Sequence, residues 1–435
     1  MSDVHHALIS CPNITSLDLR VDLAGCSEWP DRWNFPFNLH GGETYPPLQS
    51  LRLEGYQFSD RPIDENKFPT YEFLPWYERA LDWVLSGDAF KRLSYHTLPQ
   101  QQREKTNLDL WRDAMDFSHL EELAFAADYK PAHVAFFLDR MASPLTGLKR
   151  LDLDGTMANN TLTFLRDLNS SLTHLTTTNI DVLDTTGLGA EVFDANINTK
   201  LLASAVENHG PSLQHLDIHT LENLKYFTPI INPEELASSL PKLQNLTHLT
   251  LNLPRNGTWP FETLATIAST TPNLTTLDLY LDIASICRHQ KPDHSVGSIG
   301  WNDPVLKTYC TGEEQYALPY INETTALEVF EFIRHHKTGN TLQNVTFWAG
   351  DWTRQWDGPL YFPLWMHGQK VLVKCTSDGL NAEGVCHVNV GEKYWEQEDQ
   401  AALEWAYEEE QYAKIAEQLA TMPEAEEIRY KLPVH

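Results

Sequence analysis

Three histidines recur at one position in three successive segments of the sequence. His174, His215 and His248 each stand directly before a leucine, and His219 lies nearby. Imidazole binds zinc and gains a proton near neutral pH, so this spacing raises two kinds of chemistry: a metal site, or a surface that responds to acid. We favour a third interpretation, a polar row without metal, because histidine is common before this leucine in repeating segments.

Acidic residues recur at a second position, two residues further along. This position holds Asp18, Arg52, Asp152, Asp217, Asp278 and Thr346. Four aspartates on one sheet face would form an acidic stripe able to hold a basic segment of another protein. The alternative is that these side chains only keep the face solvated. Asp154, Tyr280 and Trp348, two residues further still, complete the candidate binding set.

No arrangement in the sequence predicts catalysis. The chain has no Gly-rich phosphate loop, no nucleophile elbow and no His-Glu-x-x-His motif. Cys287, His289, His294 and Cys310 are ligand types that suit zinc, but their spacing is irregular and we interpret them as loop residues. We therefore expect neither an enzyme nor a bound metal or other cofactor.

The candidate residues lie within a recurring pattern, apolar-x-x-apolar-x-apolar. Copies begin at Ile14, Leu48, Leu120, Leu148, Leu172, Leu213, Leu246, Leu274 and Leu342, and a weaker copy begins at Phe90. The last two apolar residues of each copy alternate with polar ones, as in a half-buried strand, and the intervals leave room for a helix. One such unit cannot bury its own apolar face, so the units must stack.

Stacking predicts an α/β fold, an irregular leucine-rich-repeat solenoid with a parallel concave sheet and outer helices. Neighbouring strands lie about 4.8 Å apart, so the three histidines should form a ladder on the concave side. An ordinary α/β sheet would not need the same phase in every copy. Regular repeats place Asn or Cys three residues after the last apolar position, but this chain does not, so no asparagine ladder is expected. Glycosylation sequons such as Asn245-Leu-Thr and Asn273-Leu-Thr are interpreted as products of the repeat pattern.

Two regions depart from the repeats. The solenoid is expected over residues 1–350, with an insertion at 282–322 on its rim, and residues 351–435 should cap it with an aromatic β-hairpin and an acidic helical tail. Trp29, Trp33 and Trp301 are candidate contacts on rim loops. Cys375 and Cys386 lie on opposite strands of the hairpin and could pair if in register, but we expect free thiols in an intracellular protein.

Acidic residues outnumber basic ones along the chain. The 435 residues include 32 Lys and Arg and 60 Asp and Glu, a net charge of −28, which opposes binding to nucleic acid or to an anionic membrane. No apolar run approaches a membrane span, and the first residues do not form a signal peptide. We expect a cytoplasmic or nuclear protein.

Several stretches resemble one family. Cys11-Pro-Asn-Ile-Thr-Ser-Leu-Asp-Leu, Trp29-Pro-Asp-Arg-Trp33, Tyr45-Pro-Pro-Leu-Gln-Ser-Leu-Arg-Leu and Gly350-Asp-Trp352-Thr-Arg-Gln-Trp356 are similar to filamentous-fungal F-box and leucine-rich-repeat proteins. The resemblance implies that the repeats hold a protein substrate. In that family an F-box helix bundle docks the adaptor of a cullin-RING ubiquitin ligase. Only about ten residues precede the first predicted strand here, so adaptor binding would require an F-box supplied upstream.

The leading hypothesis is therefore a protein-binding scaffold that resembles the substrate-recognition part of an F-box receptor. The second is an interaction scaffold independent of ubiquitin. The third is an enzyme built on the 282–322 insertion, which we favour least.

Overall fold

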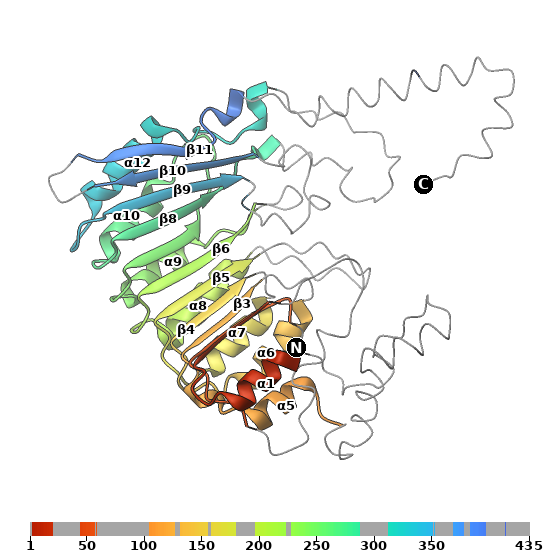
Figure 1. Ribbon diagram of the computed structural model, residues 1–435. Helices are drawn as coiled ribbons and strands as arrows, with labels where there is room; N and C mark the ends of the chain where they lie inside the picture. The colour runs from red at the N-terminus through yellow and green to blue at the C-terminus, as the bar shows by residue number, and fades with distance from the viewer. Residues whose placement is uncertain are drawn as a thin grey trace, which may run out of the picture. The chain divides into compact units, whose positions relative to one another are not determined.

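A parallel sheet with one strand per repeat is the main feature of the computed structural model (Figure 1). The structure describes residues 2–20, 44–56, 58, 104–126, 131–154, 158–179, 196–222, 228–287, 312–350, 352, 369–377, 383–396 and 414. Eleven strands follow one another in chain order, from β1 to β11. The chain divides into two compact units. The first comprises Met1–Thr220, Ile231–Leu251 and Thr270–Leu274, and the second comprises Leu221–Ile230, Asn252–Ser269 and Thr275–His435.

The first unit repeats a strand and a helix. Its strands are β1 Ser16–Arg20, β2 Ser50–Glu54, β3 Glu122–Ala126, β4 Arg150–Asp154, β5 His174–Asn179, β6 His215–Thr220 and β7 His248–Asn252, and each neighbouring pair is parallel. Its helices are α1 Ser2–Ser10, α5 Asn107–Ala114, α6 Pro131–Met141, α7 Ala158–Asp167, α8 Ile197–His209 and α9 Pro233–Ser239, with short 3-10 turns η3 Phe117–His119 and η4 Leu240–Lys242.

The register aligns the apolar positions of the repeats into columns. One column runs through Leu17, Leu51, Leu123, Leu151, Leu175, Leu216 and Leu249. All but the first are at most 1% exposed, and each such leucine stabilises the fold by about 1.5–3 kcal/mol. The predicted α/β repeat with one common phase is confirmed in these strands. The weak copy at Phe90 lies outside the described residues.

Asparagine side chains link two of the repeats to the repeat before them at an unexpected position. The Asn245 Nδ2 group donates to the carbonyl of Pro211 at 2.7 Å, and the Asn273 Nδ2 group donates to the carbonyl of Gln244 at 2.7 Å. Both asparagines stand directly before the first leucine of a repeat, and both begin sequons. The usual ladder position is indeed empty of asparagine, but these two residues satisfy the carbonyls of the bend from a different place.

We predict that Asn273→Ala lowers the free energy of unfolding by about 1 kcal/mol, because the Gln244 carbonyl loses its side-chain donor. Asn273→Asp should cost at least as much, because a carboxylate of the same shape has no N–H to donate. Asn256→Ala, on an exposed turn, is the control and should change stability by less than about 0.5 kcal/mol. Urea denaturation measures all three, and equal stability of Asn273→Ala and wild type would contradict the role of the bond.

The second unit changes strand direction after two parallel strands. Its strands are β8 Thr276–Leu281, β9 Asn344–Gly350, β10 Lys370–Thr376 and β11 Val385–Val390. The pair β8–β9 is parallel, whereas β9–β10 and β10–β11 are antiparallel. Its helices are α10 Phe261–Thr270 and α12 Glu323–His336, with 3-10 turns η6 Gly312–Gln315 and η7 Tyr394–Glu396. The boundary predicted at residue 350 stays a prediction, and the acidic tail lies outside the described residues apart from Lys414.

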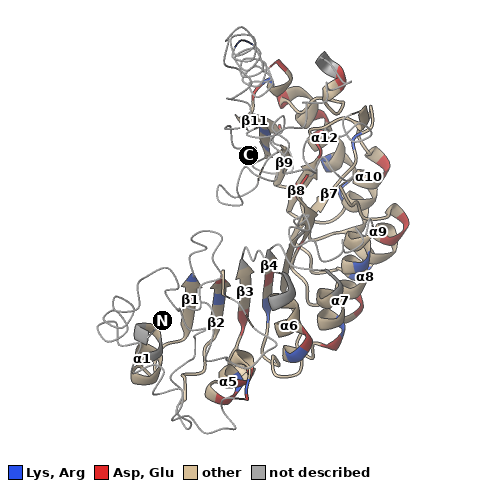
Figure 2. Ribbon diagram, turned by 90° about the vertical axis from the view of Figure 1, so that its right-hand side faces the viewer, with Lys and Arg blue, Asp and Glu red and all other residues tan. Residues whose placement is uncertain are grey.

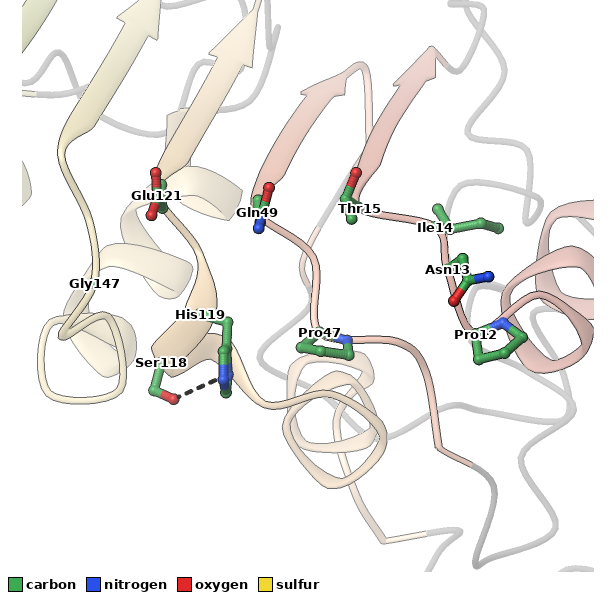
Figure 3. Close-up of a pocket in the computed structure, with 10 residues that line it drawn as sticks. All are labelled: Pro12, Asn13, Ile14, Thr15, Pro47, Gln49, Ser118, His119, Glu121 and Gly147. Atoms are coloured by element: carbon green, nitrogen blue, oxygen red, sulfur yellow. Dashed lines mark hydrogen bonds between the residues drawn. The ribbon is translucent and has the colours of Figure 1, made fainter.

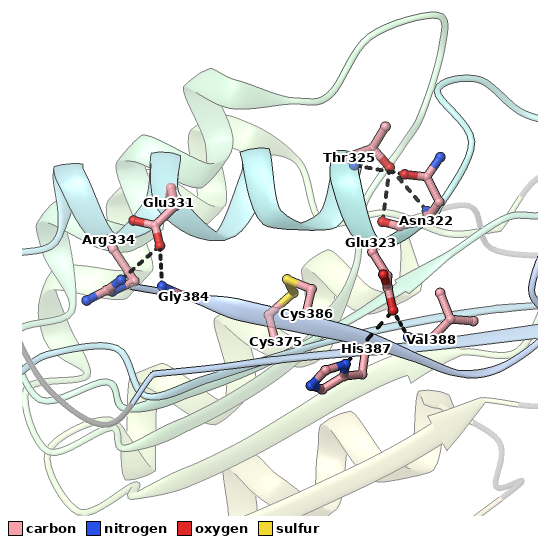
Figure 4. The surroundings of a disulfide bond; sticks show 10 residues. All are labelled: Asn322, Glu323, Thr325, Glu331, Arg334, Cys375, Gly384, Cys386, His387 and Val388. Atoms are coloured by element: carbon pink, nitrogen blue, oxygen red, sulfur yellow. Dashed lines mark hydrogen bonds and ion pairs between the residues drawn. A yellow bond between two sulfur atoms is a disulfide. The ribbon is translucent and has the colours of Figure 1, made fainter. Parts of the chain in front are cut away.

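The last two strands carry a disulfide, so the expectation of free thiols was wrong. Cys375 pairs directly opposite Cys386 in the β10–β11 register, with Cα atoms 4.0 Å apart, and the two sulfurs are bonded (Figure 4). Two carboxylates of α12 also hold β11 and the residue before it. Glu331 accepts the Gly384 N–H at 2.9 Å, and Glu323 accepts the Val388 N–H at 3.4 Å.

A buried carboxylate binds the backbone directly after β8. The side chain of Glu222 is 5% exposed and accepts two backbone N–H groups, from Ile283 at 2.6 Å and from Ala284 at 2.7 Å. The nearby Arg255 guanidinium, 7% exposed, donates to the carbonyls of Asp282 and Pro319. Together they satisfy the backbone of a segment that has left the sheet.

No helix among the described residues has the length and apolar character to cross a membrane.

Glu222→Gln should lower the free energy of unfolding by about 1–3 kcal/mol, because the amide keeps one acceptor oxygen and turns an NH2 group toward a buried N–H. Glu234→Gln, which changes an exposed carboxylate on α9, is the matched control and should be nearly neutral. Thermal denaturation followed by circular dichroism distinguishes them. Equal melting temperatures for both variants would refute the role given to Glu222.

Candidate functional site

Alternate residues of each strand project from one sheet face, which we call the open face. In the first unit, Figure 2 shows α6, α7 and α8 along the opposite face of the sheet. The first row of the open face consists of Ser16, Ser50, Glu122, Arg150, His174, His215 and His248. The second row consists of Asp18, Arg52, Ala124, Asp152, Thr176, Asp217 and Thr250. Strand alternation therefore brings all the candidate residues of this unit to one face.

The three histidines form the ladder that the sequence predicts. The His174 and His215 ring centroids are 5.6 Å apart with planes at 20°, and those of His215 and His248 are 4.2 Å apart with planes at 24°. Hydroxyls hold the outer rings: Thr173 Oγ1 lies 2.9 Å from His174 Nδ1, and Thr250 Oγ1 lies 3.2 Å from His248 Nε2. In-register parallel strands impose this stack, because they place identical side chains one strand spacing apart.

The ladder resists protonation. The pKa of His215 is lowered to about 4, chiefly by burial and then by the neighbouring His248, whereas Asp217 acts to raise it. Burial, followed by the charge of Arg150, also lowers the pKa of His174. Two positive rings 4.2 Å apart would repel by about 4 kcal/mol at an effective dielectric constant of about 20. His174 and His215 are therefore uncharged at neutral pH.

The ladder does not have the geometry of a metal site. Among the described residues, no three His, Cys, Asp or Glu side chains converge to hold a metal ion. The rings stack face to face, whereas a shared metal needs their nitrogens to converge on one point.

The aspartates share a row but are not neighbours in it. Asp18 pairs across the sheet with Arg52 and lies 3.2 Å from Arg20. Asp152 and Asp217 are separated by Thr176, so two strand spacings divide them. The stripe predicted from the sequence is therefore interrupted by neutral and basic side chains.

His219 belongs to the third row, and it is 5% exposed. Its Nδ1 atom lies 2.5 Å from Asp217 Oδ1. The side chain of Asp154, in the same row, lies outside the described residues. The structure thus couples one second-row aspartate to a histidine outside the ladder.

In the second unit, aromatic side chains pack together near the ends of β8 and β9. Asp278 pairs with Thr346, and Tyr280 pairs with Trp348 in the β8–β9 register. The Tyr280 and Trp348 rings are stacked at 5.7 Å with planes at 5°. The Trp352 ring packs edge-on against Trp348 at 4.7 Å. The rim residues Trp29, Trp33 and Trp301 lie outside the described residues, so their roles stay predictions.

The structure also has a pocket that the sequence did not suggest. It has a volume of about 550 Å³ and lies at the bends that lead into β1 to β4 (Figure 3). His119 lines it with Ser118, and both Ser118 Oγ at 3.4 Å and Asp116 Oδ2 at 3.2 Å contact the same atom, His119 Nδ1. A catalytic triad needs the serine and the carboxylate on different ring nitrogens. These residues therefore do not form one, and no motif in the sequence marks the pocket.

Comparison with known proteins adds little. No family model matches the chain, and no curated protein is significantly similar to it. A solved structure that is similar is the leucine-rich repeat-containing protein LegL7 from Legionella pneumophila, at 15% identity and a TM-score of 0.27. The match covers 66% of this chain and 82% of that one. At these values the likeness carries no functional argument, and the repeat assignment rests on the strand register.

The lowered pKa of His215 predicts a loss of stability in acid. Unfolded histidine takes up a proton near pH 6.5 and the folded residue near pH 4, so the free energy of unfolding should fall between these values. His215→Gln should remove about 2 kcal/mol of this fall, a figure reduced for partial exposure. Urea denaturation at pH 7.5, 6.0, 5.0 and 4.5 tests it. His119→Gln, at an exposed site, should follow the wild type, and parallel curves for all three proteins would contradict the prediction.

Proposed function

We propose that this protein is a non-catalytic scaffold that binds another protein along the open face of its repeats. The observation that carries the proposal is the in-register array of polar side chains in the first unit. The leucine columns between these rows are buried, so the polar residues are what the sheet presents to a partner. Repeat proteins form extended binding surfaces in this way, because each repeat contributes the same positions to one surface.

The partner proposed for the second row is a basic, extended segment. Asp152 and Asp217 lie two strand spacings apart, which is about 9.6 Å. A polyproline II chain rises about 3.1 Å per residue, so positive charges at every third residue lie about 9.3 Å apart. A segment crossing the strands could place one cation at each aspartate, with the Thr176 hydroxyl between them.

The finer proposal is that the scaffold is the substrate-recognition part of an F-box receptor that acts in the cytoplasm or nucleus. Only the resemblance of the stretches beginning at Cys11, Trp29, Tyr45 and Gly350 supports it. Co-purification of a cullin adaptor with the chain joined to an F-box would support this proposal. The disulfide between Cys375 and Cys386 is more usual in oxidising compartments and weighs against this location.

A direct test uses a fluorescent twelve-residue peptide of Lys-Pro-Pro triplets and a matched peptide of Glu-Pro-Pro triplets. We expect the lysine peptide to bind more tightly, and the double variant Asp152→Asn with Asp217→Asn to bind it about tenfold more weakly, as measured by fluorescence anisotropy. Affinity should fall with added salt, because the contacts are between charges.

Photo-crosslinking locates the contact. A benzoylphenylalanine at Thr176 on the open face should capture the lysine peptide, and the same probe at Lys200, exposed on α8, should not. Equal capture at both sites, or equal binding of the two peptides, would contradict the proposed surface.

A further inference from the structure

The ladder of His174, His215 and His248 lies in the row directly beside the second row. Along each strand the two rows are two residues, about 6.6 Å, apart. Any charge that the ladder gains is therefore placed next to the carboxylates of Asp152 and Asp217. The central ring of His215 lies between His174 and His248, and no hydrogen bond joins either of its nitrogens to another described residue.

The groups that face the ladder come from four strands. On β3 and β4 these are Glu122 and Arg150, whose side chains are about half exposed and 3.9 Å apart. On β6 they are Asp217 and His219, which contact each other. On β7 the neighbour of His248 is the uncharged Thr250. Glu122 and Arg150 lie close enough to offset each other's charge, and the carboxylates of Glu122 and Asp217 act on the nearest ladder rings, His174 and His215.

We propose that the histidine ladder is an acid-operated release device for a cationic partner held on the second row. This inference rests on the proposed function. At neutral pH His174 and His215 are uncharged, and the carboxylates of the second row attract the partner. As the pH falls, protons enter the ladder, and adjacent positive rings repel one another and any lysine or arginine beside them. The partner is then released by charge, without a change of fold.

The lowered pKa values of His174 and His215 fit this order of events. Burial lowers the pKa of both His174 and His215, so these two rings stay uncharged near pH 7 and become charged only in distinctly acidic conditions. A bound cation opposes protonation further, since binding and proton uptake compete for the same local charge.

The test measures binding of the Lys-Pro-Pro peptide at pH 7.5, 6.5, 5.5, 4.5 and 4.0 at constant ionic strength. The pKa of His215 is lowered to about 4, and aspartates also take up protons in this range, so wild type and variant should both lose affinity at the lowest pH. Wild type and the triple variant His174→Gln, His215→Gln and His248→Gln should bind equally well at pH 7.5, and at pH 4.0 wild type should have lost about threefold or more beyond the loss of the variant. His119→Gln, with the ladder intact, is the matched control and should follow wild type. Circular dichroism at each pH confirms that each protein is folded.

The outcomes separate the two proposals. Peptide binding with the same pH dependence in wild type and the triple variant overturns the release device and leaves the binding surface standing. Failure of wild type to bind the peptide at pH 7.5 overturns the cationic partner, and the release role with it. NMR titration of the ladder histidines supplies an independent readout: ring signals that titrate together with the exposed His387 would also overturn the device.

Discussion

Alignment of leucines between parallel strands is the constraint on which the structure depends. Each strand is too short to be stable alone, and each buries its apolar side chains only when the next repeat supplies the same residues at the same height. The columns of buried leucine fix the register, and a shift of one residue would turn every core side chain to the other face. The polar rows inherit their order from this requirement. The proposed binding surface is therefore a by-product of how the core is aligned.

The same alignment explains the histidine ladder. Stacked imidazoles are a poor choice for a site that must carry charge, because neighbouring rings repel once they are protonated. They suit a site that must be neutral under one condition and charged under another. Thr173 and Thr250 hold the outer rings by hydroxyl contacts, whereas burial between these rings lowers the pKa of the central His215 to about 4.

Much of the architecture follows from the sequence, because the repeat pattern indicates which residues of each strand are buried. The strands, their parallel order and the stacking of His174, His215 and His248 all come from the spacing of apolar residues. What the sequence could not show depends on contacts between segments that are distant along the chain. Asn245 and Asn273 were interpreted as accidents of the pattern, yet they bond the preceding repeat. Glu222 gives no local signal, because its partners lie about sixty residues away. An intracellular location predicts free thiols at Cys375 and Cys386, but the strand register brings them together and they form a disulfide.

The side-chain links from Asn245 and Asn273 have a mechanical consequence. Each spans a single pair of adjacent repeats, and the backbone bonds between parallel strands do the same. A pulling force along the direction of stacking would load these bonds in series rather than together. Repeats of the first unit would then detach one at a time, each at a modest force. The unit would therefore unfold stepwise under load and not in a single cooperative event.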